Sequence, residues 1–280
     1  HLERSFFAVH EVGESSSGGY HYLHNGTTLH GVQALDEEYE KVPLSYYYLT
    51  GPLGQVFEEL GKRDERHSVA AVGLGTGAVA SYTRPGQTMT FYEIDPAVER
   101  IATNPAYFTY LKHCPGTCEI ILGDGRLQLA MAPDHHYELI ILDAYSSTAI
   151  PIHLLTKEAV EMYLDKLTDD GIIAFHISNR HLDLEPALTQ LANELGLVTR
   201  YQDYRADDPS LYNLYVDGSD WVIMARTPKA LGPIAFDDRW VEFGVSEGVR
   251  IWTDDYAAII QAYRFPFTPF WSWVESLIWR

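Results

Sequence analysis

The sequence is short of cysteine, of long hydrophobic runs and of positive charge. Only two of its 280 residues are cysteine, and both lie in Cys114-Pro-Gly-Thr-Cys118. This spacing could close a small loop but supplies only half of a zinc site, so we expect free thiols and no metal. No run reaches the roughly 18 apolar residues of a membrane span, and the start at His1 shows no signal-peptide pattern. We therefore expect a soluble portion of something longer.

Positive charge is scarce, because 39 acidic residues face 20 basic ones and the formal net charge is −19. Such a surface repels phosphate backbones, which disfavours a nucleic-acid partner, and it tolerates a cationic substrate. Hydrophobic residues make up 46% and charged residues 21% of the chain. This composition is that of a folded globular enzyme rather than of a disordered segment.

The chain begins with a β-rich pattern. Aromatic and polar residues alternate over 5–12 and 20–24, with a Ser-Gly turn between them, which predicts a β-hairpin followed by a strand near 28–33. Helical spacing then covers 43–62. We place a small N-terminal β-domain at 1–42, a Rossmann-like catalytic domain at 43–264 and an aromatic tail at 265–280.

After residue 66 the pattern of strand, glycine turn and helix repeats, which predicts an α/β fold with a largely parallel sheet covered on both faces. Expected helices cover 97–103, 126–130, 157–167, 184–195 and, late in the chain, 252–263, and loops or a lid are expected over 203–220 and 227–253. Expected strands cover 68–72, 88–92, 119–122, 138–142, 171–176 and 221–225. Ligands of such sheets bind beyond the carboxyl ends of the strands.

A glycine-rich turn, Gly73-Leu-Gly75-Thr76-Gly77, follows the first of these strands. Glycines there let the backbone turn sharply and approach a ligand. Glu93 ends the next strand, where a carboxylate can accept both hydroxyls of a ribose. The glycine spacing is tighter than the dinucleotide fingerprint. It favours an S-adenosylmethionine-type ligand over NAD, and so a Rossmann-like fold of the class I methyltransferase type.

Two further strands end in acids. Asp124-Gly125 can reach the adenine amino group, although Asp124 could equally cap a helix. Asp143, followed by Tyr145, ends a strand that is almost entirely apolar, and an acid in that position is partly desolvated. An amine must be neutral to attack a carbon next to a sulfonium, so a carboxylate that takes its proton is the natural catalyst. The other interpretation of Asp143 is a turn cap.

With these segments in order, the chain resembles the spermidine synthase family of aminopropyltransferases, particularly the spermidine synthase-like domains fused to membrane transporter-like segments. The resemblance runs from about residue 28 to 225. It rests on Leu29-His-Gly-Val-Gln33, the glycine turn, Tyr92-Glu-Ile-Asp95, Gly123-Asp-Gly125, Asp143, Leu154-Leu-Thr-Lys-Glu158 and the strand 171–176.

The resemblance implies transfer of an aminopropyl group from decarboxylated S-adenosylmethionine to a polyamine in a cytoplasmic homodimer, with an attached membrane segment as another setting. It assigns Gln33 to the edge of the donor site and a tyrosine of 46–48 to the acceptor groove. The expected donor-binding residues are Gln33, Gly73, Gly75, Thr76, Gly77, Glu93, Asp124 and Gly125, the catalytic residues Asp143 and Tyr145, and the acceptor-binding residues Tyr46, Tyr47, Ser146 and Asp254.

Two positions depart from the family pattern. Thr76 stands where the family has an aspartate that holds the donor's amine, and Ser146 stands near a second aspartate that grips the acceptor. Each charge-assisted hydrogen bond lost in this way could cost roughly 1.5 to 3 kcal/mol. Two alternatives therefore stand beside aminopropyl transfer: a methyltransferase or other sulfonium-cleaving enzyme that uses intact S-adenosylmethionine, and a non-catalytic nucleotide-sensing module.

Overall fold

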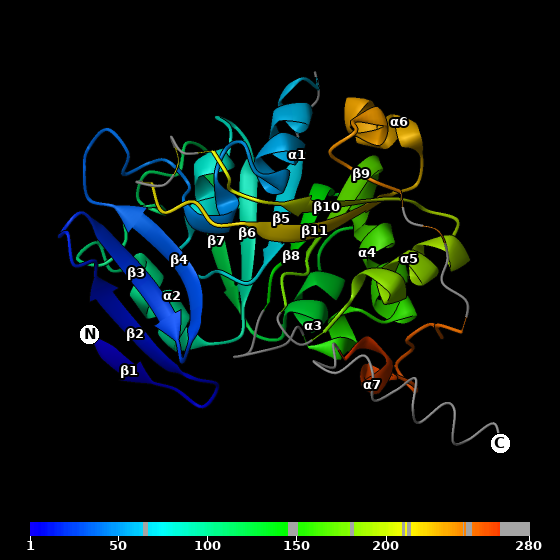
Figure 1. Ribbon diagram of the computed structural model, residues 1–280, viewed down its shortest axis with the longest axis horizontal. Helices are drawn as coiled ribbons and strands as arrows, with labels where there is room; N and C mark the ends of the chain where they lie inside the picture. Colours follow the sequence, from blue (N-terminus) through cyan, green and yellow to red (C-terminus); the bar gives the residue numbers. More distant parts are fainter. Residues whose placement is uncertain are drawn as a thin grey trace.

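The computed structural model describes residues 1–63, 67–144, 151–179, 182–208, 211, 214–242, 244 and 248–263. This part of the chain holds two β-sheets, the larger one covered by helices (Figure 1). Tyr145, Ser146 and the aromatic tail 265–280 lie outside the described residues. No helix of the described ranges is long and apolar enough to cross a membrane.

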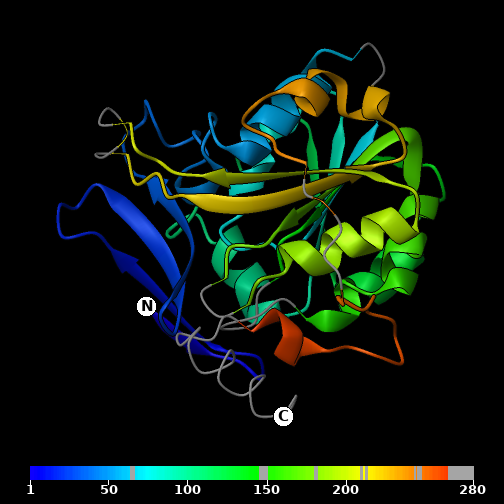
Figure 2. The ribbon, with the colours of Figure 1, turned by 45° about the vertical axis from the view of Figure 1, so that its right-hand side comes forward.

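The N-terminal sheet is antiparallel, and both ribbon views show it beside the α/β body (Figures 1 and 2). It lies against the body through Val12 and Leu23, which pack with Ile101 and Phe108. Its strands, in spatial order, are β1 (Leu2–Arg4), β2 (Val9–Glu14), β3 (Tyr20–Asn25) and β4 (Thr28–Ala34). The predicted hairpin and third strand are present.

One part of that expectation was wrong, because residues 5–8 form a turn between β1 and β2 instead of a strand. The hydroxyl of Ser5 accepts the backbone N–H groups of Phe7 and Ala8 at 3.0 and 3.1 Å. A serine side chain that bonds nearby N–H groups competes with strand pairing. Residues 5–8 therefore project from the N-terminal sheet where this sheet meets the α/β body.

The larger sheet has the order β10-β11-β9-β8-β5-β6-β7, in which β5 to β9 are parallel and β11 and β10 antiparallel. The expected, largely parallel sheet is confirmed, but no strand was predicted for the residues of β10. Its strands are β5 (Ser68–Val72), β6 (Thr88–Glu93), β7 (Thr117–Leu122), β8 (Tyr137–Leu142), β9 (Leu167–His176), β10 (Val198–Tyr204) and β11 (Ser219–Ala225).

Alternate strand residues face two separate cores, as the apolar strands predict. Ala71 and Ile141 face one core, which α1 (Pro52–Gly61), α2 (Pro96–Thr103), α6 (Pro228–Leu231) and the short helices η2 (Ala78–Tyr82) and η5 (Gly232–Phe236) cover. Val72 and Leu142 face the other, which α3 (Gly125–Ala130), α4 (Lys157–Lys166) and α5 (Glu185–Glu194) cover. Because the larger sheet is buried on both faces, its strands are held in place, and so are their carboxyl ends, where the ligand site is expected.

Three further expectations need correction. The helical stretch 43–62 divides into η1 (Ser45–Tyr47) and α1, because Gly51-Pro52 starts a new helix. The late helix 252–263 reduces to α7 (Ile259–Ala262). The cysteines are not free: Cys114 and Cys118 form a disulfide, with Cα atoms 6.3 Å apart. Pro115-Gly116 bends the chain between them, and a side chain on Gly116 would collide with the Gln87 carbonyl.

Candidate functional site

A pocket of about 130 Å³ lies at the carboxyl ends of the parallel strands, where the N-terminal sheet meets them. Loops after β5, β6, β7 and β8 supply one wall, and the N-terminal sheet and its turn supply another. The lining residues are Phe7, Ala8, His10, Leu23, Asn25, His30, Tyr46, Tyr47, Val72, Gly73, Leu74, Gly75, Tyr92, Glu93, Ile94, Asp95, Val98, Asp124, Gly125, Asp143, Ala144, Pro151, His153 and Leu154.

The glycine turn after β5 is shaped by close backbone contacts. Gly73 and Gly75 have φ angles of 104° and 53°. A Cβ on Gly73 would lie 2.3 Å from the carbonyl oxygen of Asp143, and one on Gly75 would lie 2.8 Å from that of His30. Only glycine allows this conformation without a collision. The turn therefore lies directly against both the β8 loop and β4.

Glu93, at the end of β6, is buried in the pocket wall. Its carboxylate accepts the N–H of Leu74 at 3.0 Å and that of Asp95 at 2.8 Å. Burial raises the pKa of Glu93 above its ordinary value, although these N–H groups oppose the shift. The two N–H bonds fix the carboxylate beside the glycine turn, where it retains lone pairs for ribose hydroxyls.

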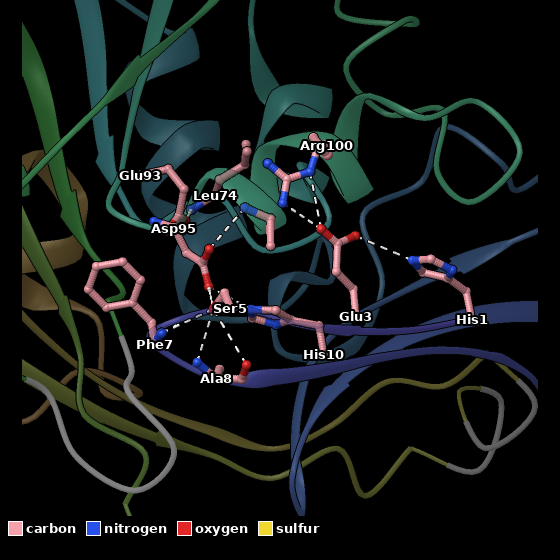
Figure 3. Close-up of polar contacts among 11 residues, drawn as sticks. His1, Glu3, Ser5, Phe7, Ala8, His10, Leu74, Glu93, Asp95 and Arg100 are labelled. Carbon is pink, nitrogen blue, oxygen red and sulfur yellow. Dashed lines mark hydrogen bonds and ion pairs between the residues drawn. The ribbon is translucent and has the colours of Figure 1, made fainter.

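Asp95 joins the pocket to the N-terminal sheet, as Figure 3 shows. Its carboxylate accepts the hydroxyl of Ser5, lies 2.8 Å from Nε2 of His10, and caps α2 by accepting the N–H of Ala97 at 2.9 Å. Burial raises the pKa of Asp95, but the hydrogen bonds from Ser5 and His10 outweigh it and hold the pKa below its ordinary value. The carboxylate thereby holds the β1–β2 turn, with Phe7, against the mouth of the pocket.

Asp124 lies at the start of α3. One of its oxygens accepts the N–H of Leu127 at 3.0 Å, so the capping role foreseen for it is present, and the other lies 3.0 Å from Nε2 of His153. Both Asp124 and His153 line the pocket. The cap orients the carboxylate without using all its acceptor positions.

Asp143 follows β8 and faces the pocket with a side chain that is 6% exposed. The hydroxyl of Tyr47 donates to Oδ2, and Nδ1 of His176 lies 2.6 Å from Oδ1. Because a carboxylate only accepts, Nδ1 of His176 carries the proton and donates it. Burial and then the charge of Asp143 raise the pKa of Tyr47 well above its ordinary value, so the phenol stays protonated. Asp143 is thus a fixed, doubly hydrogen-bonded acid.

His176 is itself held in place by three neighbours. Its ring stacks between Tyr46 and Trp221, with centroids 4.6 and 4.8 Å away, and its Nε2 lies 2.8 Å from the hydroxyl of Ser178. Ser178 in turn accepts the N–H of Asp220 at 2.8 Å. These contacts fix the ring plane, and the ring in turn fixes the orientation of Asp143.

The structure brings most of the expected site residues together and leaves some apart. Lining the pocket are Tyr46, Tyr47, Gly73, Gly75, Glu93, Asp124, Gly125 and Asp143. Outside its lining are Gln33, which bonds Thr109; Thr76, buried against Gly31; Gly77, beside Leu111; and Asp254, which binds Arg126. Tyr145 and Ser146 lie outside the described residues. In the described ranges, no three His, Cys, Asp or Glu side chains gather as metal ligands.

Sequence reasoning missed the histidines of this site. His10 and His30 come from the N-terminal sheet, His153 from the segment before α4 and His176 from the end of β9. The chain has 12 histidines, so the residue type alone gave no signal. The position of His176 did give a signal, because His176 ends a buried parallel strand next to the strand that Asp143 follows.

Part of the sequence is similar to that of known polyamine aminopropyltransferases. No protein-family model matches the sequence. Over 110 residues, 38% of this chain and 36% of the other, it is 31% identical to a polyamine aminopropyltransferase of Vibrio vulnificus. Over 118 residues, 41% of this chain and 25% of the other, it is 28% identical to a probable polyamine aminopropyl transferase of Bifidobacterium longum. The match thus spans about a third or less of these relatives.

Solved structures extend the similarity of fold to most of the chain. A probable spermidine synthase from Corynebacterium glutamicum superposes with a TM-score of 0.62 over 80% of this chain and 79% of that one, at 16% identity. Spermidine synthase from Thermotoga maritima superposes with a TM-score of 0.57 over 99% and 86%, at 13% identity. At this identity the likeness concerns the fold.

The fold is a Rossmann-like α/β fold with an added N-terminal antiparallel sheet, similar to that of the spermidine synthases. This is the fold class expected from the sequence. The chain is similar to polyamine aminopropyltransferases in the sequence of the matched segment and to spermidine synthases in its fold.

Proposed function

We propose that this protein is an aminopropyltransferase, which passes the aminopropyl group of decarboxylated S-adenosylmethionine to an amine acceptor, a polyamine, and releases methylthioadenosine. The observation that carries the proposal is the charge of the pocket. Its lining holds Glu93, Asp95, Asp124 and Asp143, and the described lining contains neither lysine nor arginine. Acids that no lysine or arginine of the lining neutralises favour a cationic ligand, here a sulfonium and amines.

The same charge distribution supports the decarboxylated donor over the intact one. Intact S-adenosylmethionine carries a carboxylate, which would lie among the acids of this pocket with no lysine or arginine of the described lining to pair with it. Like charges in a poorly solvated site repel strongly. The methyltransferase alternative therefore lacks the group that would hold its cofactor.

The residues can be given roles within this proposal. Glu93 would accept ribose hydroxyls and Asp124 the adenine amino group, with the glycine turn against the nucleoside. Gly125 lies at the start of α3, where a side chain would collide with Val72. The fit rests on the glycine turn after β5, where a Cβ on Gly73 or Gly75 would collide with neighbouring backbone. It rests also on the carboxylate of Glu93 at the end of the neighbouring strand.

Asp143 would act on the acceptor. The acceptor amine loses a proton to the carboxylate, and its nitrogen lone pair forms a bond to the methylene carbon next to sulfur. The carbon–sulfur bond breaks, its electron pair stays on sulfur, and methylthioadenosine leaves as a neutral thioether. Tyr47 and His176 hold the carboxylate in place for this step, because each donates to one of its oxygens.

The remaining parts of the proposal are domain boundaries at 1–42, 43–264 and 265–280, a homodimer and a cytoplasmic setting. Tyr46 and Tyr47 would border the acceptor. Tyr145 and Ser146 are proposed near it from the sequence alone, and Gln33, Thr76 and Gly77 would support the donor site from behind. Sedimentation of the purified chain would test the dimer.

The deciding test is product analysis. The protein is incubated with decarboxylated S-adenosylmethionine and either putrescine or spermidine, and mass spectrometry follows methylthioadenosine and the lengthened amine. Both products are expected, and neither is expected when intact S-adenosylmethionine replaces the donor. Release of S-adenosylhomocysteine from the intact compound would establish methyl transfer instead. Donor binding without any product, in the presence of both acceptors, would favour a sensing module.

A further inference from the structure

His30 presents a buried polar atom that the fold itself does not use. The residue lies in β4 and lines the pocket, and its Nε2 is buried with no hydrogen-bond partner among the described residues. Buried side-chain nitrogens are normally paired, because an unmade hydrogen bond costs free energy. A ligand in the pocket is the partner that this nitrogen lacks.

The position of His30 places it at the reacting end of the pocket. Its backbone carbonyl lies against Gly75 of the glycine turn, and it lines the same pocket as Asp143. Burial lowers the pKa of His30 to about 4, although Asp143 opposes this shift. The ring is therefore neutral at physiological pH and keeps a lone pair on one nitrogen.

A second histidine of the same sheet has the same property. Nδ1 of His10 is buried without a partner among the described residues, and His10 also lines the pocket. Its Nε2 lies 2.8 Å from the carboxylate of Asp95, so Nδ1 is the ring nitrogen that this contact leaves unpaired. The N-terminal sheet thus contributes two histidines, each with an unpaired imidazole nitrogen, to a pocket lining that also holds four acids.

We propose that His30 is a specificity-determining residue whose neutral imidazole accepts a hydrogen bond from an ammonium group of the substrate beside Asp143. This rests on the proposed aminopropyl transfer, in which both the donor arm and the acceptor end in an amine. The arrangement holds the ammonium through one neutral acceptor and one carboxylate. A carboxylate ligand would find the same nitrogen next to Asp143 and be repelled.

The test compares ligands that differ in the ammonium. Methylthioadenosine contains the nucleoside and the methylthio group of the donor but lacks its aminopropyl arm. Calorimetric dissociation constants for decarboxylated S-adenosylmethionine and methylthioadenosine are measured on the whole chain, together with the acceptor KM. The variants are His30→Leu, which removes the acceptor, His30→Gln, which retains one, and the control His24→Leu, on the adjacent strand and outside the pocket lining.

The expected result is a roughly tenfold or larger rise in the donor Kd for His30→Leu, with methylthioadenosine within twofold of the native value. His30→Gln should fall between, and His24→Leu should bind both ligands normally. A rise confined to the acceptor KM would also support the contact and assign it to the acceptor amine. Equal weakening of both nucleosides, or no change in any constant, would overturn the inference.

Failure of the proposed function gives a different result. If decarboxylated S-adenosylmethionine binds through His30 but no methylthioadenosine forms with either acceptor, aminopropyl transfer is wrong and the ammonium contact stands. If the unmodified chain does not bind the donor at all, both are wrong.

Discussion

Asp143 is held between Tyr47 and His176, each of which donates a hydrogen bond to a different oxygen of its carboxylate. Tyr47 comes from the segment that follows the N-terminal sheet, and His176 ends the strand next to β8. Each donor uses one oxygen, and the remaining lone pairs of the carboxylate are left for the pocket. The acid is therefore oriented before any amine arrives.

Replacement of this acid tests its catalytic role. Asp143→Asn retains the shape of the side chain but cannot take a proton, so kcat for methylthioadenosine release should fall by about 10² to 10⁴-fold. The donor Kd, measured by calorimetry, should stay within a few-fold. Turnover close to that of the unmodified protein would remove Asp143 from the reaction.

His176 is expected to act by positioning Asp143. His176→Phe keeps a ring between Tyr46 and Trp221 but loses the N–H, whereas His176→Asn keeps an N–H near the position of Nδ1. We expect kcat to fall about tenfold or more in the phenylalanine variant, because the carboxylate loses the donor that orients it. The asparagine variant should recover most of the lost kcat. Equal kcat values for the two variants would indicate that the ring matters only for packing.

The buried Glu93 should give donor binding a pH dependence. Because burial raises the pKa of this carboxyl, it takes up a proton at a higher pH than an exposed glutamate does. As pH falls through the raised pKa, the carboxylate that accepts the ribose hydroxyls is lost and the donor Kd rises. Calorimetry between pH 8 and pH 4 should show this, and the dependence should weaken in Glu93→Gln, which binds less tightly at every pH. A Kd unchanged over this range would contradict the role.

His30 should make folding stability depend on pH in the same sense as a salt-bridged acid, but at higher pH. Its pKa is about 4 in the folded protein and about 6.5 in the unfolded chain, so the unfolded state takes up the extra proton between these values. Stability should fall by up to about 3 kcal/mol as pH drops from 7 to 4. Denaturant titrations of the unmodified protein and His30→Leu give the contribution by difference. Equal pH slopes in the two proteins would rule it out.

Asp254 is expected to contribute to stability and little to the reaction. It binds both terminal nitrogens of Arg126, at 2.6 and 2.7 Å, and this pairing lowers its pKa to about 2. The pair is partly exposed, so Asp254→Asn should cost only about 0.5 to 1 kcal/mol at pH 7. That contribution is present above pH 4 and disappears as pH falls toward 2. The acceptor KM should change less than twofold, and a tenfold rise would return Asp254 to the acceptor site.

The strand-and-turn pattern of residues 68–142 could be read from the sequence because its signals are local. Apolar strands, the glycine turn, Glu93 and Asp143 follow one another at fixed positions, and parallel strands bring their ends together automatically. The strand Val198–Tyr204 was not predicted, because it is a half-buried, polar edge strand and its pairing with β11 is a contact that its own sequence does not indicate. The disulfide was not predicted, because the spacing of Cys114 and Cys118 is compatible with a closed loop and with free thiols alike.

The histidines show the limit of sequence reasoning more clearly. Nothing in the local sequence of His10 or His30 indicates that β2 and β4 meet the glycine turn, and the contact arises only when the N-terminal sheet packs on the α/β body. Tyr47 and Asp143, which are 96 positions apart, likewise meet only in the folded chain. Residues that act through such contacts are recognised from the structure.

The attachment of the β1–β2 turn to Asp95 means that the ligand and the N-terminal sheet are thermodynamically linked. A donor bound between the two sheets touches both, so any opening that lifts the turn from Asp95 must also release the donor. At a donor concentration 100 times the Kd, the free energy needed for that opening would grow by about 2.7 kcal/mol. Amide protons of β1 and β2 should then exchange about a hundredfold more slowly. Exchange in the N-terminal sheet would thus report the occupancy of a site whose glycine turn follows β5 of the larger sheet.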